Sequence, residues 1–143
     1  KSALKILNKQ FADKNIKKTY LALVQNRPPE DAATLRDFLF KDHKNKKAVI
    51  FGRKAKDRSS VILDYEIVSE QKKGFLLKVV PHSGKYHQIR AQLAHIGCPI
   101  VGDEKYGGRF DERQKINLHA ATLSFNDPVS GRRMTLKAPC PLV

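Results

Sequence analysis

The 143-residue chain holds no tryptophan, one methionine and two cysteines, and only the cysteines could cross-link it. Cys98 and Cys140 lie far apart and match no C-x-x-C spacing, which argues against a disulfide framework and against a zinc ribbon. We expect both to be reduced thiols that pack against other side chains. A chain of this length can bury about two thirds of its unfolded surface, so residues 1–143 are predicted to form a single domain without such links.

Long apolar runs are also missing. No window approaches the roughly 18 continuous apolar residues of a membrane helix, and residues 1–20 lack the apolar core and cleavage site of a signal peptide. We therefore expect no membrane partner and a cytoplasmic location. The first residue is Lys1 rather than methionine, so we also expect the chain to be part of a longer protein.

Acidic residues are scarce, with 14 against 28 lysines and arginines, which gives a formal charge of +14 with the histidines neutral. Such an excess favours a polyanionic partner, of which nucleic acid is the first candidate. An acidic membrane surface is the second, but that interpretation requires one long basic amphipathic helix. The charges here are spread over predicted loops, strands and short helices, so nucleic acid is preferred.

Apolar periodicity predicts more strands than helices. In chain order we expect a helix over 2–14, strands at 19–24 and 49–52, a hairpin over 61–81, a helix that ends at Gly97 and a second hairpin over 116–139. Ile89, Leu93 and Ile96 are expected to share one face of the helix that ends at Gly97. Apart from the short strand, residues 35–60 are mixed and polar, and the basic run "KDHKNKK" at 41–47 is expected to be a solvated loop. The strands occur in runs rather than in alternation with helices. This order predicts an α+β fold with a mixed, mainly antiparallel sheet and a few short helices.

The stretch "HSGKYHQIRAQLAHIG" at 82–97 gathers three histidines and an arginine on a loop and the helix after it. His87 and His95 are eight residues apart, about two helical turns, so one metal ion could not readily bind both. No metal site is therefore predicted. Lys85 does not fit a P-loop, because Tyr86 follows it and no glycine stands at the required earlier position. A looser backbone contact to an RNA phosphate stays open.

Three further positions have alternative interpretations. Arg90, in the first turn of the helix, is placed to hold a carboxylate through two hydrogen bonds, but surface arginines are common. Tyr20 is either a half-buried packing residue of its strand or an aromatic ring that stacks on a flipped base. Asp64 and Glu66 share a strand face and could form an acid and base pair, although solvated carboxylates are the simpler interpretation in so basic a chain.

The segments "KKTYLALV", "LLKVVPHSGKYHQIRAQLAHIGCPIVGDEKYGG", "LHAATLSF" and "KAPCP" occur in this order. Together they resemble the catalytic domain of the RluA-type pseudouridine synthases over nearly the whole chain. The resemblance implies a pseudouridine synthase-like fold and a cofactor-free isomerase. Its partner would be structured rRNA or tRNA, in which one uridine is flipped out, cleaved from its ribose and rejoined through C5.

The resemblance also implies roles for single residues. Tyr20 matches the active-site tyrosine, which would stack on the uracil ring and could accept its C5 proton late in the reaction. Arg90 matches the arginine that pairs with the catalytic aspartate. We expect RNA contacts from Lys85, His82 and His87. His87 is expected to orient the loop through hydrogen bonds as well, as is Gln88.

The nucleophilic aspartate of the family lies in an H-R-L-D block that precedes the stretch matching Lys1, and no such block occurs in this chain. Asp13 and Asp103 lie in other contexts and are not assigned its role. We therefore expect the C-terminal portion of a synthase domain, in which an unpaired Arg90 turns towards water and loosens residues 82–87. The alternative is a catalytically inactive RNA-binding module of the same fold. No feature of the sequence assigns an oligomeric state.

Overall fold

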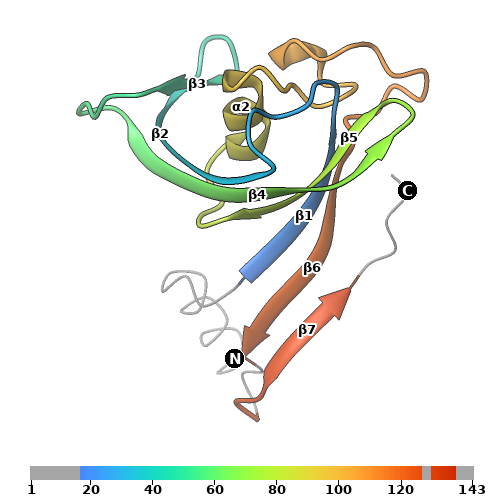
Figure 1. Cartoon of the computed structure of the whole chain (residues 1–143). Helices are drawn as coiled ribbons and strands as arrows, with labels where there is room; N and C mark the ends of the chain where they lie inside the picture. Colours follow the sequence, from blue (N-terminus) through green and yellow to red (C-terminus); the bar gives the residue numbers. More distant parts are fainter. Residues whose placement is uncertain (1–16, 127–129, 138–143) are drawn as a thin grey trace.

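The computed structural model describes residues 17–126 and 130–137. In these ranges the chain forms a seven-stranded sheet with the strand order β3-β2-β4-β5-β1-β6-β7 (Figure 1). Every neighbouring pair is antiparallel. The strands are β1 (Lys17–Val24), β2 (Ala32–Asp42), β3 (Lys47–Phe51), β4 (Ser59–Gln71), β5 (Gly74–Pro81), β6 (Leu118–Asn126) and β7 (Arg133–Lys137).

The described ranges also contain the helix α2 (Gln88–His95) and the 3-10 turn η1 (Glu104–Tyr106), which confirms the α+β class with a mainly antiparallel sheet. The two predicted hairpins correspond to β4–β5 and β6–β7, and the predicted strand at 19–24 lies within β1. The helix expected over 2–14 lies outside the described residues.

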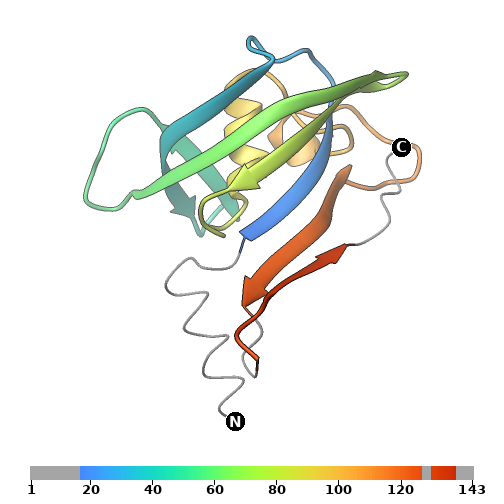
Figure 2. The same cartoon turned by 60° about the horizontal axis from the view of Figure 1, so that its bottom comes forward.

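Alternation along β4 creates the two faces of the sheet. Val61, Leu63 and Tyr65 are buried, whereas Asp64 and Glu66 point the other way and are about half exposed. Because side chains alternate along a strand, this pattern places one face of β4 against α2 and the other in solvent. Figure 2 shows β4 crossing in front of α2, so the helix lies behind the sheet in that view. We call the side away from α2 the outer face.

The main core lies between α2 and the central strands. Its members are apolar, mostly β-branched or leucine side chains that are at least nine-tenths buried: Ala22, Val24, Leu63, Tyr65, Leu77, Val79, Ile89, Leu93, Cys98 and Ile100. Burying one leucine, isoleucine or valine side chain stabilises a fold by about 1.5–3 kcal/mol. The predicted apolar side of the helix is thus confirmed for Ile89 and Leu93. Gly97 follows α2 with φ of 83°, the left-handed conformation expected at a helix end.

Strand β2 was not predicted. Residues 35–60 were expected to be mixed and polar with one short strand at 49–52, but β2 pairs with β4 on one side and with β3 on the other. The basic run "KDHKNKK" was expected to be a solvated loop. Only its middle is a turn, and its ends, Lys41 and Lys47, belong to β2 and β3.

Candidate active site

Gln88 fixes the loop that precedes α2. Its side-chain oxygen accepts hydrogen bonds from the Ser83 hydroxyl at 3.0 Å and from the Lys85 backbone N–H at 3.3 Å. Its Nε2 donates to the carbonyl of Ile62 on β4 at 3.1 Å. Since Gln88 is 97% buried, these bonds are shielded from water and attach residues 83–85 to the sheet. The predicted orienting role of Gln88 agrees with this geometry.

The same loop forms one wall of a small pocket of about 210 Å³, which we call the Tyr20 pocket. Four of the five predicted site residues line it, namely Tyr20 from β1, Lys85 and His87 from the loop, and Arg90 from α2. Gly84, Ile89 and Leu118 are also part of its lining. The chain therefore brings an aromatic ring from β1 to the same cavity as a lysine and a guanidinium from the loop and helix at 82–95.

Arg90 is paired, and its partner is Asp103. Nε donates to Oδ2 of Asp103 at 2.9 Å, and Nη2 donates to Oδ1 at 2.8 Å. The Asp103 side chain is 1% exposed and that of Arg90 is 18% exposed. The hydrogen bonds to this carboxylate are the main reason why the pKa of Arg90 is raised, so the guanidinium is always charged.

Two expectations are corrected, one by this pair and one by the hydrogen bonds of Gln88. Arg90 was expected to lack a carboxylate in this chain and to turn towards water, but it is bound on two atoms to a buried aspartate. The loop over 82–87 was expected to loosen, but buried Gln88 holds it on the sheet. The pairing of Asp103 with Arg90 was not predicted, and the turn-rich "GDEKYGG" around Asp103 is the signal for it in the sequence.

His87 has a left-handed backbone, with φ of 52°, at the start of α2. This conformation is strained in a residue other than glycine, by about 1 kcal/mol or more. Its ring stacks on Tyr86 with 3.8 Å between centroids, and its Nδ1 lies 2.7 Å from the Tyr106 hydroxyl. Burial, followed by the charge of Arg90, lowers the pKa of His87 and keeps the imidazole neutral at pH 7. His87 thus helps to shape the loop, as predicted.

Tyr20 lies half-buried on β1, where it pairs with Val79 of β5 and Ala120 of β6. Burial raises the pKa of its phenol, so the hydroxyl is protonated at neutral pH. A protonated phenol is a weak base. This environment suits a ring that packs against a flat ligand better than a ground-state proton acceptor.

A family model for RNA pseudouridylate synthase matches residues 1–95, which is more than half of the chain. The chain belongs to the RNA pseudouridylate synthase family. The predicted resemblance is therefore confirmed. Residues 17–95 of the match contain the first five strands and α2, and so include Tyr20, Lys85 and Arg90.

Relatives extend the similarity over nearly the whole chain. An uncharacterized RNA pseudouridine synthase of Chlorobaculum parvum is 32% identical over 158 residues, which cover 98% of this chain and 48% of the relative. Ribosomal large subunit pseudouridine synthase C of Buchnera aphidicola (strain APS from Acyrthosiphon pisum) is 32% identical over 149 residues, or 97% of this chain and 46% of the relative. The chain thus spans about half the length of the curated relatives it matches.

A solved structure shares the fold. Human RNA Pseudouridylate Synthase Domain Containing 1 superposes with a TM-score of 0.83 at 23% sequence identity, and the match covers 100% of this chain and 62% of the human chain. The antiparallel sheet with α2 behind it is therefore the fold of this pseudouridylate synthase structure as well.

His82, the fifth predicted site residue, does not line the Tyr20 pocket of this synthase-family chain. Its Nε2 lies 2.8 Å from Oδ2 of Asp64 on the outer face, and its backbone N–H donates to the carbonyl of Ile62. The Thr34 hydroxyl donates to the other oxygen of Asp64. These hydrogen bonds lower the pKa of Asp64.

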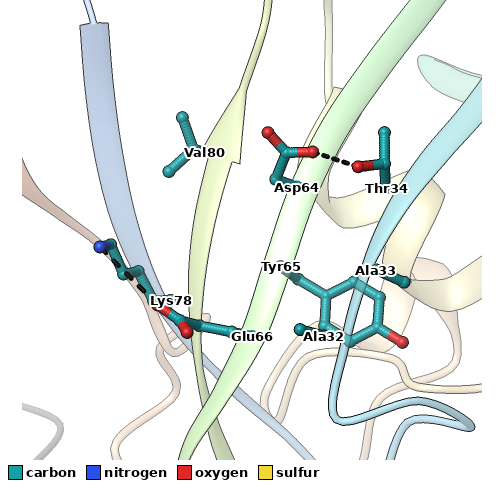
Figure 3. A pocket seen from close by; sticks show the side chains of 8 residues that line it. All are labelled: Ala32, Ala33, Thr34, Asp64, Tyr65, Glu66, Lys78 and Val80. Carbon is teal, nitrogen blue, oxygen red and sulfur yellow. Dashed lines mark hydrogen bonds and ion pairs between the residues drawn. The ribbon is translucent and has the colours of Figure 1, made fainter.

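A second hollow, of about 410 Å³, lies on this outer face (Figure 3). Figure 3 shows Asp64 bonded to Thr34 and Glu66 paired with Lys78. Nζ of Lys78 lies 3.7 Å from Oε1 of Glu66. The side chains of Asp64 and Glu66 are 46% and 56% exposed. A general acid needs a raised pKa, whereas that of Asp64 is lowered, so the interpretation of these carboxylates as solvated surface groups is the better one.

The described ranges hold neither a cluster of metal ligands nor a membrane-spanning helix. These ranges hold no group of three or more histidines, cysteines, aspartates or glutamates that could bind a metal ion. The helices within them are too short or too polar to cross a bilayer. Cys98 is a free, buried thiol in the core, and Cys140 lies outside the described residues.

Proposed function

We propose that this chain is the C-terminal portion of the catalytic domain of an RluA-type RNA pseudouridine synthase. The enzyme isomerises a specific uridine of structured RNA to pseudouridine. The observation that carries the proposal is the Tyr20 pocket, where Tyr20 and Arg90 line one cavity in a chain that belongs to this family. We further propose that residues 1–143 fold as one domain.

In this proposal Tyr20 stacks on the uracil ring of the flipped nucleotide. The half-buried ring supplies a flat apolar surface, and stacking of a base on an aromatic side chain contributes about 1–3 kcal/mol. Proton transfer from C5 to Tyr20 requires the phenolate, which the raised pKa makes rare at neutral pH. Stacking is therefore the main role that we assign to this residue.

Arg90 orients and stabilises the carboxylate that attacks the nucleotide. The family resemblance places that carboxylate in an H-R-L-D block, which is absent from these 143 residues. Asp103 is an unsuitable nucleophile, because its side chain is 1% exposed and both of its oxygens accept hydrogen bonds from Arg90. An attacking group has to reach the sugar or base directly.

Lys85 contacts an RNA phosphate. It is exposed at the rim of the Tyr20 pocket, and it also lines a neighbouring hollow with Lys41, His43 and Tyr86. His82 and His87 are the weaker candidates for RNA contacts, since one is bound to Asp64 and the other to Tyr106. The charge of +14 supplies the remaining, sequence-independent attraction to RNA.

The substrate that we propose is RNA of the large ribosomal subunit, rather than tRNA. Support comes from relatives in Buchnera and other bacteria that carry the name ribosomal large subunit pseudouridine synthase C. A cytoplasmic location follows from this substrate. No cofactor is required, because the isomerisation breaks the bond between the base nitrogen and the ribose and forms one from C5, with no net oxidation or reduction.

A second candidate is an RNA-binding module without catalysis, which is favoured by the strong positive charge of a sequence that lacks the aspartate block. The test uses the full-length product of the gene and, separately, residues 1–143. Each is incubated with total RNA from a synthase-deficient strain, and pseudouridine is quantified and mapped by mass spectrometry. We expect product in large-subunit rRNA from the full-length protein and none from residues 1–143. Binding without product from either protein would favour the module.

A further inference from the structure

We propose that Asp103 is a positioning residue, which holds one edge of the Arg90 guanidinium so that a second edge faces the Tyr20 pocket. This inference rests on the proposed function and adds a residue to it. Arg90 then acts as a bridge between two anions, with buried Asp103 on one side and the attacking carboxylate on the other.

The hydrogen bonds of Arg90 leave N–H donors available for a second anion beside Asp103. A guanidinium has five N–H donors in a planar fork. Asp103 takes one from Nε and one from Nη2. Among the described residues, no acceptor is bound to Nη1, so the edge formed by Nη1 and the remaining Nη2 donor is available to a ligand.

The two edges lie in different surroundings. Arg90 lines the Tyr20 pocket and keeps 18% of its side chain exposed, while Asp103 does not line that pocket and is 1% exposed. The bond to Asp103 is therefore on the buried side. Because Arg90 is a lining residue of that pocket, we assign the available edge to the side that faces the cavity.

Asp103 is the centre of hydrogen bonding in the turn over 102–108, which follows α2. Its backbone oxygen accepts hydrogen bonds from the N–H groups of Tyr106 and Gly108, and its own N–H donates to Ile100. Gly108 has no room for a side chain, since a Cβ there would lie 2.1 Å from the Ile100 oxygen. Asp103 is thus fixed by its backbone, and the direction of Arg90 is set before any RNA is bound.

Tyr106 closes the third side of Arg90. Its ring centroid lies 5.0 Å from the guanidinium carbon, and its hydroxyl accepts a hydrogen bond from the backbone of Ala48 on β3. A guanidinium confined by a carboxylate and an aromatic ring loses little further freedom when a second anion binds. Preorganisation of this kind acts on the rate more than on the affinity for RNA.

The test compares variants of the full-length protein. We expect Asp103→Asn to lower kcat by about 10- to 100-fold, because small misplacements of a catalytic group have effects of this order, and to change the Kd for RNA less than twofold. Asp111→Asn is the matched control. Asp111 is also buried and lies near an arginine, Arg113, in the same segment, but it does not touch Arg90. We expect its kcat within twofold of the parent value.

A double variant separates positioning from general stability. If Asp103 acts through Arg90, Asp103→Asn combined with Arg90→Lys has the same kcat as Arg90→Lys alone. Losses that multiply in the double variant, or a kcat of Asp103→Asn equal to the parent value, overturn the proposal.

A readout without catalysis keeps this inference distinct from the proposed function. In proton–nitrogen NMR spectra of the same proteins, the Arg90 Nε–H signal, assigned by its absence in Arg90→Lys, should exchange slowly with water. We expect rapid exchange in Asp103→Asn and slow exchange in Asp111→Asn. A parent protein that makes no pseudouridine overturns the proposed function, and the Nε–H signal then decides the pairing alone. Rapid exchange in the parent overturns the pairing.

Discussion

Arg90 is bound in a way that a lysine cannot reproduce. Two of its nitrogen atoms donate to separate oxygens of Asp103 at 2.9 and 2.8 Å, while the lysine ammonium is a point charge without a planar fork. Its side chain is also largely buried, which removes the screening by water that weakens surface pairs. A change of Arg90 to lysine therefore keeps the positive charge but removes the planar pair of hydrogen-bond donors.

We therefore expect Arg90→Lys in the full-length protein to reduce kcat by about 10²-fold and to change the Kd for RNA less than about threefold. The measurement is single-turnover kinetics together with RNA binding at one salt concentration. Lys85→Ala is the comparison in the same pocket, and it should weaken binding more than it slows turnover. Equal turnover of Arg90→Lys and the parent would remove Arg90 from the mechanism.

Asp64 gives a second prediction, for acid stability. Hydrogen bonds from Thr34 and then His82 lower its pKa in the folded protein. The stability that this carboxylate contributes is therefore complete above about pH 4, the ordinary pKa of aspartate, and is lost as the pH falls through the lower folded value. Because Asp64 is 46% exposed, solvent screening limits the effect to about 1 kcal/mol.

The check is the melting temperature of the parent and of Asp64→Asn between pH 7 and pH 3. The parent should be the more stable protein near neutrality, and the difference should shrink below about pH 4. Glu66→Gln removes the same charge from the same face without the hydrogen bonds of Thr34 and His82. A difference for Asp64→Asn that is constant over the whole range would contradict the assignment.

At the scale of elements, the turn over 102–108 places Asp103 under α2, and Gly108 makes the close approach possible. We expect Gly108→Ala to destabilise the fold by about 1–3 kcal/mol, the usual effect of forcing an extra methyl group into a packed site. Urea unfolding measures the change. Gly52→Ala is the control, since no heavy atom lies within 4 Å of a Cβ at Gly52. Similar values for the two variants would mean that the turn adapts without loss.

Strand β4 has a clean period and was predictable from sequence, whereas β2 has none and was not. Val61, Leu63 and Tyr65 alternate with polar residues, so β4 was found from sequence. In β2 the apolar residues come as Leu35 followed by the run 38–40, with a single residue buried, because the strand lies next to the edge strand β3. This pattern has neither the strand period nor the helix period.

The site was predictable in part, for a different reason. Tyr20, Lys85 and Arg90 were named through the family resemblance, and all three line one pocket. His82 is adjacent to that loop in sequence but lies with Asp64 on the outer face, because side chains next to each other in an extended segment point to opposite sides. The pairing of Arg90 with Asp103 joins residues 13 positions apart through a turn, which no local pattern indicates.

At the scale of the whole molecule, the charge of +14 dominates any encounter with RNA. We expect residues 1–143 to bind RNA weakly and with a steep salt dependence, because phosphate contacts release condensed counterions and carry no sequence information. Fluorescence anisotropy at 50 and 200 mM salt should show a loss of affinity of about 10³-fold or more if six or more phosphates are contacted. An RNA affinity that is the same at both salt concentrations would contradict binding through phosphate contacts.

Cys98 lies where the end of α2 meets the centre of the sheet, with 1% of its surface exposed. Burial raises the pKa of its thiol, and only the thiolate reacts with alkylating agents. In the folded protein the rate of Cys98 alkylation therefore reports how often the core opens between α2 and the sheet. Peptide mass spectrometry reads Cys98 and Cys140 separately, and we expect Cys98 to react only as fast as the core opens. Addition of an RNA that engages Arg90 should slow that reaction, whereas labelling as fast as in the unfolded chain would contradict the closed core.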